Sequence, residues 1–351
     1  MARALDLAWR GWGRVQPNPL VGAVVLVGEE PVGEGWHPEY GDRHAEAMAL
    51  AAAGERARGA TLVVTLEPCA HQGKQPPCTE MILRSGVRRV VVAILDPHPA
   101  AAGGGERLRS AGLEVEVGTL RELARAQNAM FLHAVRGLAR PFVALKLATT
   151  LDCRIADAGG RSRWISGEPA REYVQWLRAG FDALAIGGRT ARLDDPSLTV
   201  RGPLKPRRPP RRIVFDRTAD LGPGLSLVRT ATETPTIAVV SASADRAKVK
   251  LLESSGLTVV VAASLEDALG SLHAMGIGSL LVEGGGELAG ALLRDGLVDR
   301  YYWIQAPLWL GDGAVPAVAG LPGRPLDQAT RWQVVERRSM GEDTLLVLDR
   351  A

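Results

Sequence analysis

Three side chains that bind metal ions constrain this chain more than any other feature of its sequence. His44, Cys69 and Cys78 lie in one short stretch, and each cysteine directly follows a proline. One imidazole and two thiolates suit a tetrahedral Zn²⁺ that keeps its fourth position open to water. Glu46, two residues after the histidine, is an acid placed to move the protons of that water. The pattern therefore predicts a zinc site that activates water.

The local sequence also predicts where these ligands lie in a fold. Alternating apolar residues over 62–65 indicate a strand that delivers Cys69 at its carboxyl end. Cys78 begins a helical pattern, and a helix dipole favours the thiolate at such a position. His44 directly precedes another helical pattern. The alternative, a surface histidine with two buried cysteines that only fill space, leaves Glu46 and the prolines unexplained.

A histidine and a nearby glutamate, with two proline-linked cysteines further on, match the signature of zinc-dependent deaminases. In that signature two residues separate the cysteines, whereas eight separate Cys69 from Cys78 here. Two alternatives stay open. One is a nucleoside or nucleic-acid deaminase with an accessory domain. The other is a zinc-stabilised binding module without catalysis, in which His71 is the nearest candidate for the fourth ligand that structural zinc requires.

Length and composition narrow the class of protein. The chain has 351 residues, enough for two domains, and 46% of them are hydrophobic. Its net charge of +3 demands no polyanionic partner, so we expect no nucleic acid as a ligand. A zinc site uses two of the three cysteines, which leaves only Cys153 and predicts a reducing cytoplasm. No segment has the pattern of a signal peptide or a membrane span.

The first part of the chain alternates strands with helices, which predicts an α/β layered domain. Strands are expected over 23–27 and 87–95, the second of them a continuous apolar run typical of a buried strand. A single helix is expected over 120–137, ended by glycine and proline. We place the boundary directly after this helix, which gives domains over 1–139 and 140–351.

The second part of the chain contains two features that suit anionic ligands. Lys146 lies in an apolar strand pattern, where an unpaired charge is costly and a partner is expected. The strand expected over 279–283 runs into three glycines, 284–286, and then a helix. Free backbone N–H groups at such a helix start bind phosphate, although a plain glycine turn explains the same residues. The basic run over 202–212 lacks interleaved aromatic side chains, so we expect a solvated surface loop.

Four motifs of the first part occur in order: Asn18-Pro19-Leu20-Val21-Gly22, His44-Ala45-Glu46, Thr65-Leu66-Glu67-Pro68-Cys69-Ala70-His71 and Pro76-Pro77-Cys78. They resemble the deaminase half of bacterial bifunctional riboflavin biosynthesis enzymes of the RibD type, within the cytidine-deaminase superfamily. That family has the longer gap between its cysteines. The resemblance implies that His44, Cys69 and Cys78 hold zinc and that Glu46 shuttles the proton.

The same resemblance assigns the substrate of the first domain. It implies that Asn18 contacts the pyrimidine and that His71 and Lys74 contact the ribose phosphate. Taken alone, Asn18 is an ordinary turn residue, and the two basic residues are equally well explained as incidental loop charges. Three residues differ from what the family usually has: His98 replaces asparagine, Gly104 replaces arginine and Gln75 replaces threonine.

The second part resembles the reductase half of the same enzymes, whose fold is similar to dihydrofolate reductase. The resemblance implies an NADPH site lined by Ala148, Trp164, Ser166, Thr190, Asp194, Gly285, Gly286, Glu287, Leu288, Ala289, Gly290 and Ala291. It implies a sugar-phosphate site lined by Lys146, Ser162, Arg178, Leu198, Arg201 and Glu283. Cys153 stands where the family usually has glycine, and we expect a small side chain tolerated beside the cofactor.

Together the two resemblances cover nearly the whole chain and imply two successive reactions. The first is zinc-dependent hydrolytic deamination of 2,5-diamino-6-ribosylamino-4(3H)-pyrimidinone 5′-phosphate. The second is NADPH-dependent reduction of the ribosyl side chain to ribityl. We further expect a homo-oligomer joined through the reductase domain, at a sheet edge formed by the final strands over 297–307 and 344–348.

Overall fold

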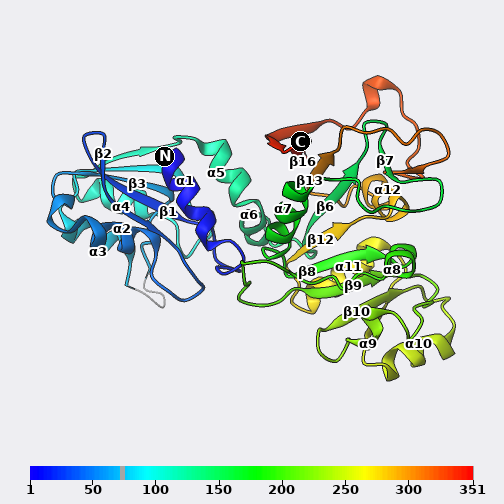
Figure 1. Cartoon of the computed structure of the whole chain (residues 1–351). Coiled ribbons are helices and arrows are strands. Elements are labelled where there is room, and N and C mark those ends of the chain that lie inside the picture. Colours follow the sequence, from blue (N-terminus) through cyan, green and yellow to red (C-terminus); the bar gives the residue numbers. More distant parts are fainter. Residues whose placement is uncertain (72–75, 351) are drawn as a thin grey trace. The chain divides into compact units, whose positions relative to one another are not determined.

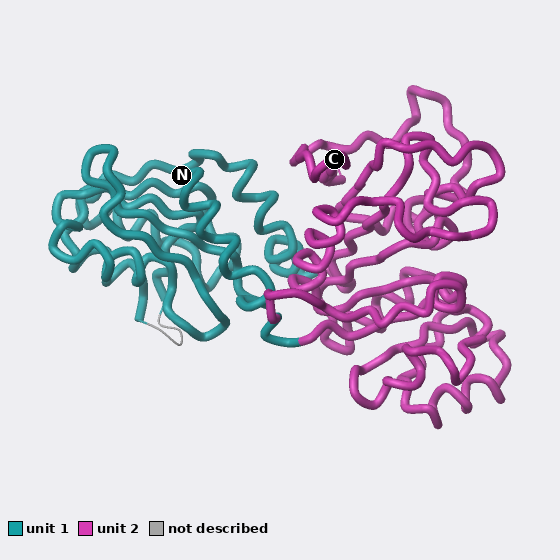
Figure 2. The backbone as a smooth tube through the Cα atoms, viewed as in Figure 1, with its two compact units in different colours: residues 1–137, 206–208 teal, residues 138–205, 209–351 magenta. Residues whose placement is uncertain are grey.

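The computed structural model describes residues 1–71 and 76–350. The chain forms two compact units (Figure 2). Unit 1 contains Met1–Gly137 together with Pro206–Arg208, and unit 2 contains Leu138–Lys205 and Pro209–Ala351. Among the helices described, none is long and apolar enough to cross a membrane.

Unit 1 is built on a five-stranded sheet in the order β2-β1-β3-β4-β5 (Figure 1). Its strands are β1 (Gly22–Val27), β2 (Glu30–Trp36), β3 (Thr61–Leu66), β4 (Arg89–Ile94) and β5 (Glu114–Val117). Strand β1 pairs antiparallel with β2 and β3, whereas β3, β4 and β5 are parallel. Parallel neighbours place the carboxyl ends of β3 and β4 at the same edge, which is where ligands of such sheets gather.

Helices cover both faces of this sheet, so unit 1 has three layers, and the α/β layered domain predicted for it is confirmed. They are α1 (Ala2–Ala8), α2 (Ala45–Ala53), α3 (Cys78–Ser85), α4 (Gly104–Ser110), α5 (Arg121–Gln127) and α6 (Ala129–Val135), with short 3₁₀ turns at Trp9–Gly11 and Gly54–Ala57. Alternate strand residues point to opposite faces. Val25 and Leu62 therefore pack with α2, α3 and α4, while Val24 and Val63 pack with α1.

Two glycines of β2 bring α2 unusually close to the sheet. A Cβ at Gly33 would lie 2.2 Å from the carbonyl oxygen of Ala49, and one at Gly35 would lie 2.3 Å from that of Ala45. No side chain fits at those distances, so only glycine permits this approach. The start of α2 is thereby held beside the end of β3.

The prediction of a single helix over 120–137 is wrong, because the chain forms two helices that meet at Asn128. The Asn128 side chain pairs with the backbone of Leu20: it accepts from the Leu20 N–H at 2.8 Å and donates to the Leu20 carbonyl at 3.0 Å. This distant pairing fixes the break. The helical composition of the segment contains no signal for it.

Unit 2 contains a nine-stranded sheet in the order β11-β10-β9-β8-β12-β6-β13-β16-β15. Its strands are β6 (Phe142–Thr149), β8 (Ala183–Gly187), β9 (Arg211–Phe215), β10 (Thr236–Val240), β11 (Thr258–Val261), β12 (Ser279–Glu283), β13 (Arg300–Gln305), β15 (Trp332–Met340) and β16 (Asp343–Arg350). The strands from β11 to β13 are parallel, and β16 and β15 are antiparallel to their neighbours. A small pair, β7 (Arg154–Ala156) and β14 (Val315–Pro316), lies apart.

The helices of unit 2 pack on this sheet in two clusters. They are α7 (Glu168–Arg178), α8 (Gly188–Asp194), α9 (Ser226–Arg229), α10 (Arg246–Ser254), α11 (Leu265–Ala274) and α12 (Gly286–Arg294), with a 3₁₀ turn at Leu326–Gln328. Buried residues of α11 and α12 pack with Leu145 and Val282, while those of α8, α9 and α10 pack with Val214 and Ala238. Unit 2 is therefore also of the α/β class, as the expected similarity to dihydrofolate reductase implies.

The predicted sheet edge is wrong in detail. Strands β13 and β16 exist, but both lie inside the sheet, and the edge strand is β15. Its charged residues, Glu336 to Arg338, interrupt the apolar pattern. Charged residues on an edge strand discourage unwanted pairing, and they also hide the strand from a search for apolar runs.

We predict that Gly290→Ala destabilises unit 2, although alanine is the better helix former by about 1 kcal/mol. Gly290 lies in α12, and an added Cβ would lie 1.8 Å from the Ala319 carbonyl oxygen. Overpacking typically costs about 1–3 kcal/mol, so the thermal midpoint should fall. Gly323→Ala is the matched control, since nothing lies within 4 Å of a Cβ there. An unchanged or raised midpoint for Gly290→Ala would contradict the close approach.

Candidate functional site

The three predicted metal ligands converge at the end of β3 in unit 1. His44 precedes α2, Cys69 follows β3, and Cys78 is the first residue of α3. Their ligand atoms all lie within 4.8 Å of one another. His44 Nδ1 is 3.1 Å from Cys78 Sγ and 3.7 Å from Cys69 Sγ. The prediction that these side chains form one cluster is confirmed.

The chemistry of this cluster fits Zn²⁺. The backbone N–H of Cys78 donates to Cys69 Sγ at 3.4 Å. A hydrogen bond from the Cys78 thiol, more than any other cause, lowers the pKa of Cys69 to about 4. One thiol of the pair therefore ionises readily, and a bound cation displaces the proton of the other. Two thiolates and an imidazole are a donor set for zinc that leaves one position open.

Glu46 lies in the first turn of α2, and its residue is only 4% exposed. Burial raises the pKa of Glu46, although the neighbouring His44 acts in the opposite direction. A carboxyl whose pKa is raised towards neutral pH both accepts and returns a proton readily. Its position beside the cluster suits a proton carrier.

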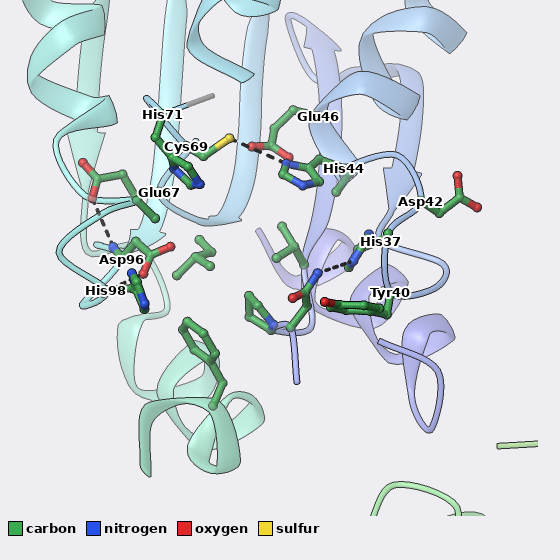
Figure 3. A pocket seen from close by; sticks show the side chains of 18 residues that line it. His37, Tyr40, Asp42, His44, Glu46, Glu67, Cys69, His71, Asp96 and His98 are labelled. Atoms are coloured by element: carbon green, nitrogen blue, oxygen red, sulfur yellow. Dashed lines mark hydrogen bonds between the residues drawn. The ribbon is translucent and has the colours of Figure 1, made fainter. Parts of the chain in front are cut away.

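A cavity of about 330 Å³ opens beside this cluster (Figure 3). Its polar lining comprises Asn18, His37, Tyr40, Asp42, His44, Glu46, Glu67, Cys69, His71, Asp96 and His98. Asn18 and His71, which were predicted to contact substrate, are both among them. Lys74 and Gln75 fall outside the residues that the structure describes.

Sequence reasoning missed Glu67 and Asp96, which lie on the same side of the cavity as His98 (Figure 3). Glu67 accepts from the backbone N–H of Asp96 at 3.1 Å and of Gly105 at 2.8 Å, so it ties two loops together. Asp96 accepts from the His98 N–H at 2.9 Å, and burial raises the pKa of Asp96. Glu67 stands inside the cysteine motif, and that position was the one available signal.

The departure at Gly104 has a structural reason. A Cβ there would lie 1.8 Å from the carbonyl oxygen of Pro68, the residue before the ligand Cys69. The loop around Gly104 therefore touches the cysteine motif directly, and an arginine at this position would need a different backbone path.

The basic run over 202–212 also differs from expectation. Arg207 belongs to unit 1, donates to the Gln16 carbonyl at 2.6 Å and covers the Tyr40 ring at 4.9 Å, so it is not simply solvated.

Unit 2 contains a larger cavity of about 1560 Å³ at the carboxyl ends of its parallel strands. Most of the predicted reductase residues line it: Lys146, Ala148, Ser162, Trp164, Ser166, Arg178, Thr190, Asp194, Leu198, Arg201, Glu283, Gly285, Gly286, Glu287, Leu288 and Ala291. Ala289 and Gly290 do not. Ala289 is buried in the core, and Gly290 contacts the backbone at Ala319. Both residues pack against their neighbours in this structure, and their contact with a cofactor stays a prediction.

Three charged side chains meet inside this cavity. Arg178 donates twice to the Glu283 carboxylate, at 2.5 and 2.9 Å, and Lys146 lies opposite Glu283 on the paired strand. Burial alone would raise the pKa of Glu283, but the charge of Arg178 holds it below its ordinary value. Burial lowers the pKa of Lys146. The charge of Glu283 acts to raise the pKa of Lys146, so Glu283 is the electrostatic partner expected for this lysine, while the charge of Arg178 acts in the opposite direction.

The three-glycine segment provides a bare backbone surface at the start of α12. Gly285 has φ +82°, and a Cβ there would lie 3.2 Å from Thr190 Oγ1. A larger residue would fill this cradle, which suits the approach of a phosphate to backbone N–H groups.

Cys153 has φ +58°, a conformation that favours glycine, and this explains why the family usually has glycine at its position. It lies outside the residues that line the cavity, and its expected position beside the cofactor stays a prediction.

Two family models match separate parts of the chain. The family model described as "Cytidine and deoxycytidylate deaminase zinc-binding region" matches residues 1–94. The family model described as "RibD C-terminal domain" matches residues 141–346. The chain is 39% identical to the riboflavin biosynthesis protein RibD of Aquifex aeolicus, over 100% of this chain and 97% of that protein. It is 40% identical to that of Escherichia coli, over 99% and 98%.

Solved structures are similar over the same length. The diaminohydroxyphosphoribosylaminopyrimidine deaminase/5-amino-6-(5-phosphoribosylamino)uracil reductase of Thermotoga maritima has a TM-score of 0.82 at 35% identity, covering 100% of this chain and 97% of that one. Acinetobacter baumannii RibD has a TM-score of 0.80 at 36% identity, covering 100% and 97%. The similarity thus includes both cavities.

We predict that Cys78→Ala abolishes zinc binding and that Cys153→Ala leaves it unchanged. The first removes one of three protein ligands, whereas the exposed Cys153 is not in the cluster. Zinc per chain, measured by elemental analysis after dialysis, should fall from near one to near zero only in Cys78→Ala. Equal zinc content in both variants would contradict the assignment of the ligands.

Proposed function

The chain belongs to the RibD family of riboflavin biosynthesis proteins, and we propose that its two cavities perform the two successive reactions separately. The cavity of unit 1 deaminates a diaminopyrimidinone ribotide, and the cavity of unit 2 reduces its ribosyl group to ribityl. Family membership over the full chain argues against the nucleic-acid deaminase and the binding module. The observation that carries the proposal is the buried Glu46 beside the His44, Cys69 and Cys78 cluster.

The residues of unit 1 supply binding and proton transfer. His44, Cys69 and Cys78 would hold Zn²⁺, which when bound supplies the Lewis acidity that ionises water near neutral pH. Glu46 takes one proton from the attacking water and gives it to the ring nitrogen. It then takes the second proton from the hydroxyl group that has been added to the ring and gives it to the departing amine, which leaves as ammonia.

The substrate in this cavity is held at both of its ends. Asn18 contacts the pyrimidine, and His71, with Lys74 from outside the described residues, contacts the ribose phosphate. The position of Asn18 and His71 in the same cavity as Glu46 supports this assignment.

The residues of unit 2 bind an anionic substrate beside a dinucleotide. NADPH, when bound, supplies the hydride. Lys146, Ser162, Arg178, Leu198, Arg201 and Glu283 would hold the sugar phosphate, and the remaining residues of the cavity named above would hold the cofactor. The Lys146 cation neutralises developing negative charge on the sugar oxygen, which a buried ammonium does more strongly than a hydrated one.

The remaining assignments concern the whole chain. We place a deaminase domain over 1–139 and a reductase domain over 140–351, apart from Pro206–Arg208, which associates with unit 1. We also propose that the protein forms a homo-oligomer through its reductase domain. It has no nucleic-acid partner and acts in the cytoplasm. The net charge of +3 and the shortage of cysteines for disulfides support the last two.

Glu46→Gln should retain zinc and lose deamination by at least about 10²-fold, because glutamine has the same shape but carries no transferable proton. Ammonia release from the diaminopyrimidinone ribotide measures this directly. NADPH oxidation by the same preparation, with the deaminated ribotide, is the control and should stay at the wild-type level. Near-normal ammonia release would remove Glu46 from the reaction.

The reductase should lose activity as pH rises, at values below the ordinary lysine pKa of 10.5. Burial lowers the pKa of Lys146, so its proton is lost at a lower pH than from a free lysine, and the needed cation disappears. We expect kcat/KM for NADPH oxidation to show this alkaline decline in the wild type. Lys146→Arg should lack the decline because guanidinium stays protonated. An identical decline in Lys146→Arg would exclude Lys146 as its source.

A further inference from the structure

His37 is a buried histidine of unit 1 that links two loops at the cavity. It is 3% exposed, and its backbone N–H donates to the Val21 carbonyl at 2.9 Å. Its ring Nδ1 lies 3.0 Å from the Arg43 carbonyl oxygen, and Nε2 lies 3.1 Å from Asn18 Nδ2. Both ring nitrogens thus have a partner, and His37 and Asn18 both line the cavity (Figure 3 labels His37).

The two partners of His37 define a single proton arrangement. A backbone carbonyl only accepts hydrogen bonds, so Nδ1 must carry the hydrogen that faces Arg43. An amide nitrogen only donates, so Nε2 must present its lone pair to Asn18. Both requirements are met by the same neutral imidazole, protonated on Nδ1. This tautomer follows from the identities of the partner atoms.

The arrangement has a consequence for Asn18. The two ends of an amide have nearly the same shape, so an asparagine side chain can turn over unless its neighbours distinguish oxygen from nitrogen. The lone pair on His37 Nε2 can accept a hydrogen bond only from the amide nitrogen of Asn18. The oxygen end, Oδ1, then remains for the cavity, where it accepts a hydrogen bond and cannot donate one.

We propose that His37 is a positioning residue that fixes the amide of Asn18 with its oxygen towards the substrate. The subsite thereby selects an N–H donor on the ligand, either an exocyclic amine or a ring N–H of an aminopyrimidine. A carbonyl in the same place would face Oδ1 without a hydrogen, and both buried oxygen atoms would lack a hydrogen-bond partner, which is unfavourable. This selection rests on the deamination assigned above to the same cavity.

The tautomer is tested first, in the unaltered zinc-loaded protein. Long-range ¹H–¹⁵N correlation spectra distinguish histidines protonated on Nδ1 from those protonated on Nε2. The chain has six histidines, and the signal missing from His37→Gln identifies His37. We expect protonation on Nδ1 alone. Protonation on Nε2, or on both nitrogens, would overturn the proposal, because Asn18 could not then donate to the ring.

The second test compares two substitutions of His37 in ammonia release. Glutamine offers one acceptor and one donor, as the neutral imidazole does, whereas leucine offers neither. His37→Leu should raise the deaminase KM about tenfold with little change in kcat, and His37→Gln should restore most of the loss. A His37→Gln variant as impaired as His37→Leu would contradict a role through hydrogen bonding.

A double-mutant cycle separates positioning from direct contact. If His37 acts through Asn18, His37→Leu should have no further effect in a chain that already carries Asn18→Leu. Independent, multiplying effects would overturn the proposal. The His37 and His44 rings are in contact, with centroids 5.6 Å apart, so zinc content and NADPH oxidation are measured on every variant as controls for metal and folding. Absent ammonia release in the wild type would instead refute the deamination itself.

Discussion

The deaminase cavity depends on one close approach of backbone to backbone. Helix α2 can place His44 and Glu46 beside the end of β3 only because Gly33 and Gly35 let it lie against β2. Larger residues would push the helix outward, and the imidazole would no longer reach the two thiols. A cluster whose ligand atoms lie within 4.8 Å has little tolerance for such a shift. The position of the metal ligands therefore depends on Gly33 and Gly35, two residues that have no side chain.

The cavity of unit 2 depends on the mutual stabilisation of charged side chains that are largely removed from solvent. Lys146, Arg178 and Glu283 occupy the same cavity, and any one of them alone would be costly to bury. The paired register of β6 and β12 sets Lys146 opposite Glu283, and Arg178 adds two hydrogen bonds from α7. Such an arrangement keeps a cation available at low dielectric, where it acts more strongly on a reacting oxygen than in water.

Two of the departures from the usual family sequence, Gly104 and Cys153, have local explanations. Gly104 touches the Pro68 carbonyl, so this chain closes the loop directly onto its cysteine motif. Cys153 adopts φ +58°, a conformation that favours glycine, at a turn outside the cavity. His98 does line the deaminase cavity, and it is the departure that bears on substrate. None of the three alters the ligands of the cluster or Glu46.

The sequence by itself determined the zinc cluster, Glu46, the α/β class and most of the reductase cavity. The first three depend on local signals: a ligand beside a proline, a helix start or the end of an apolar strand. The residues of the reductase cavity followed from the resemblance to the reductase half of the family. Only the tertiary structure decided the break at Asn128, the edge strand β15 and the role of His37. The Asn128 side chain bonds a residue 108 positions away, and His37 joins Arg43 to Asn18 across two loops. Hydrogen bonds between segments far apart in the chain leave no periodic pattern, so they become visible only once the backbone brings their partners together.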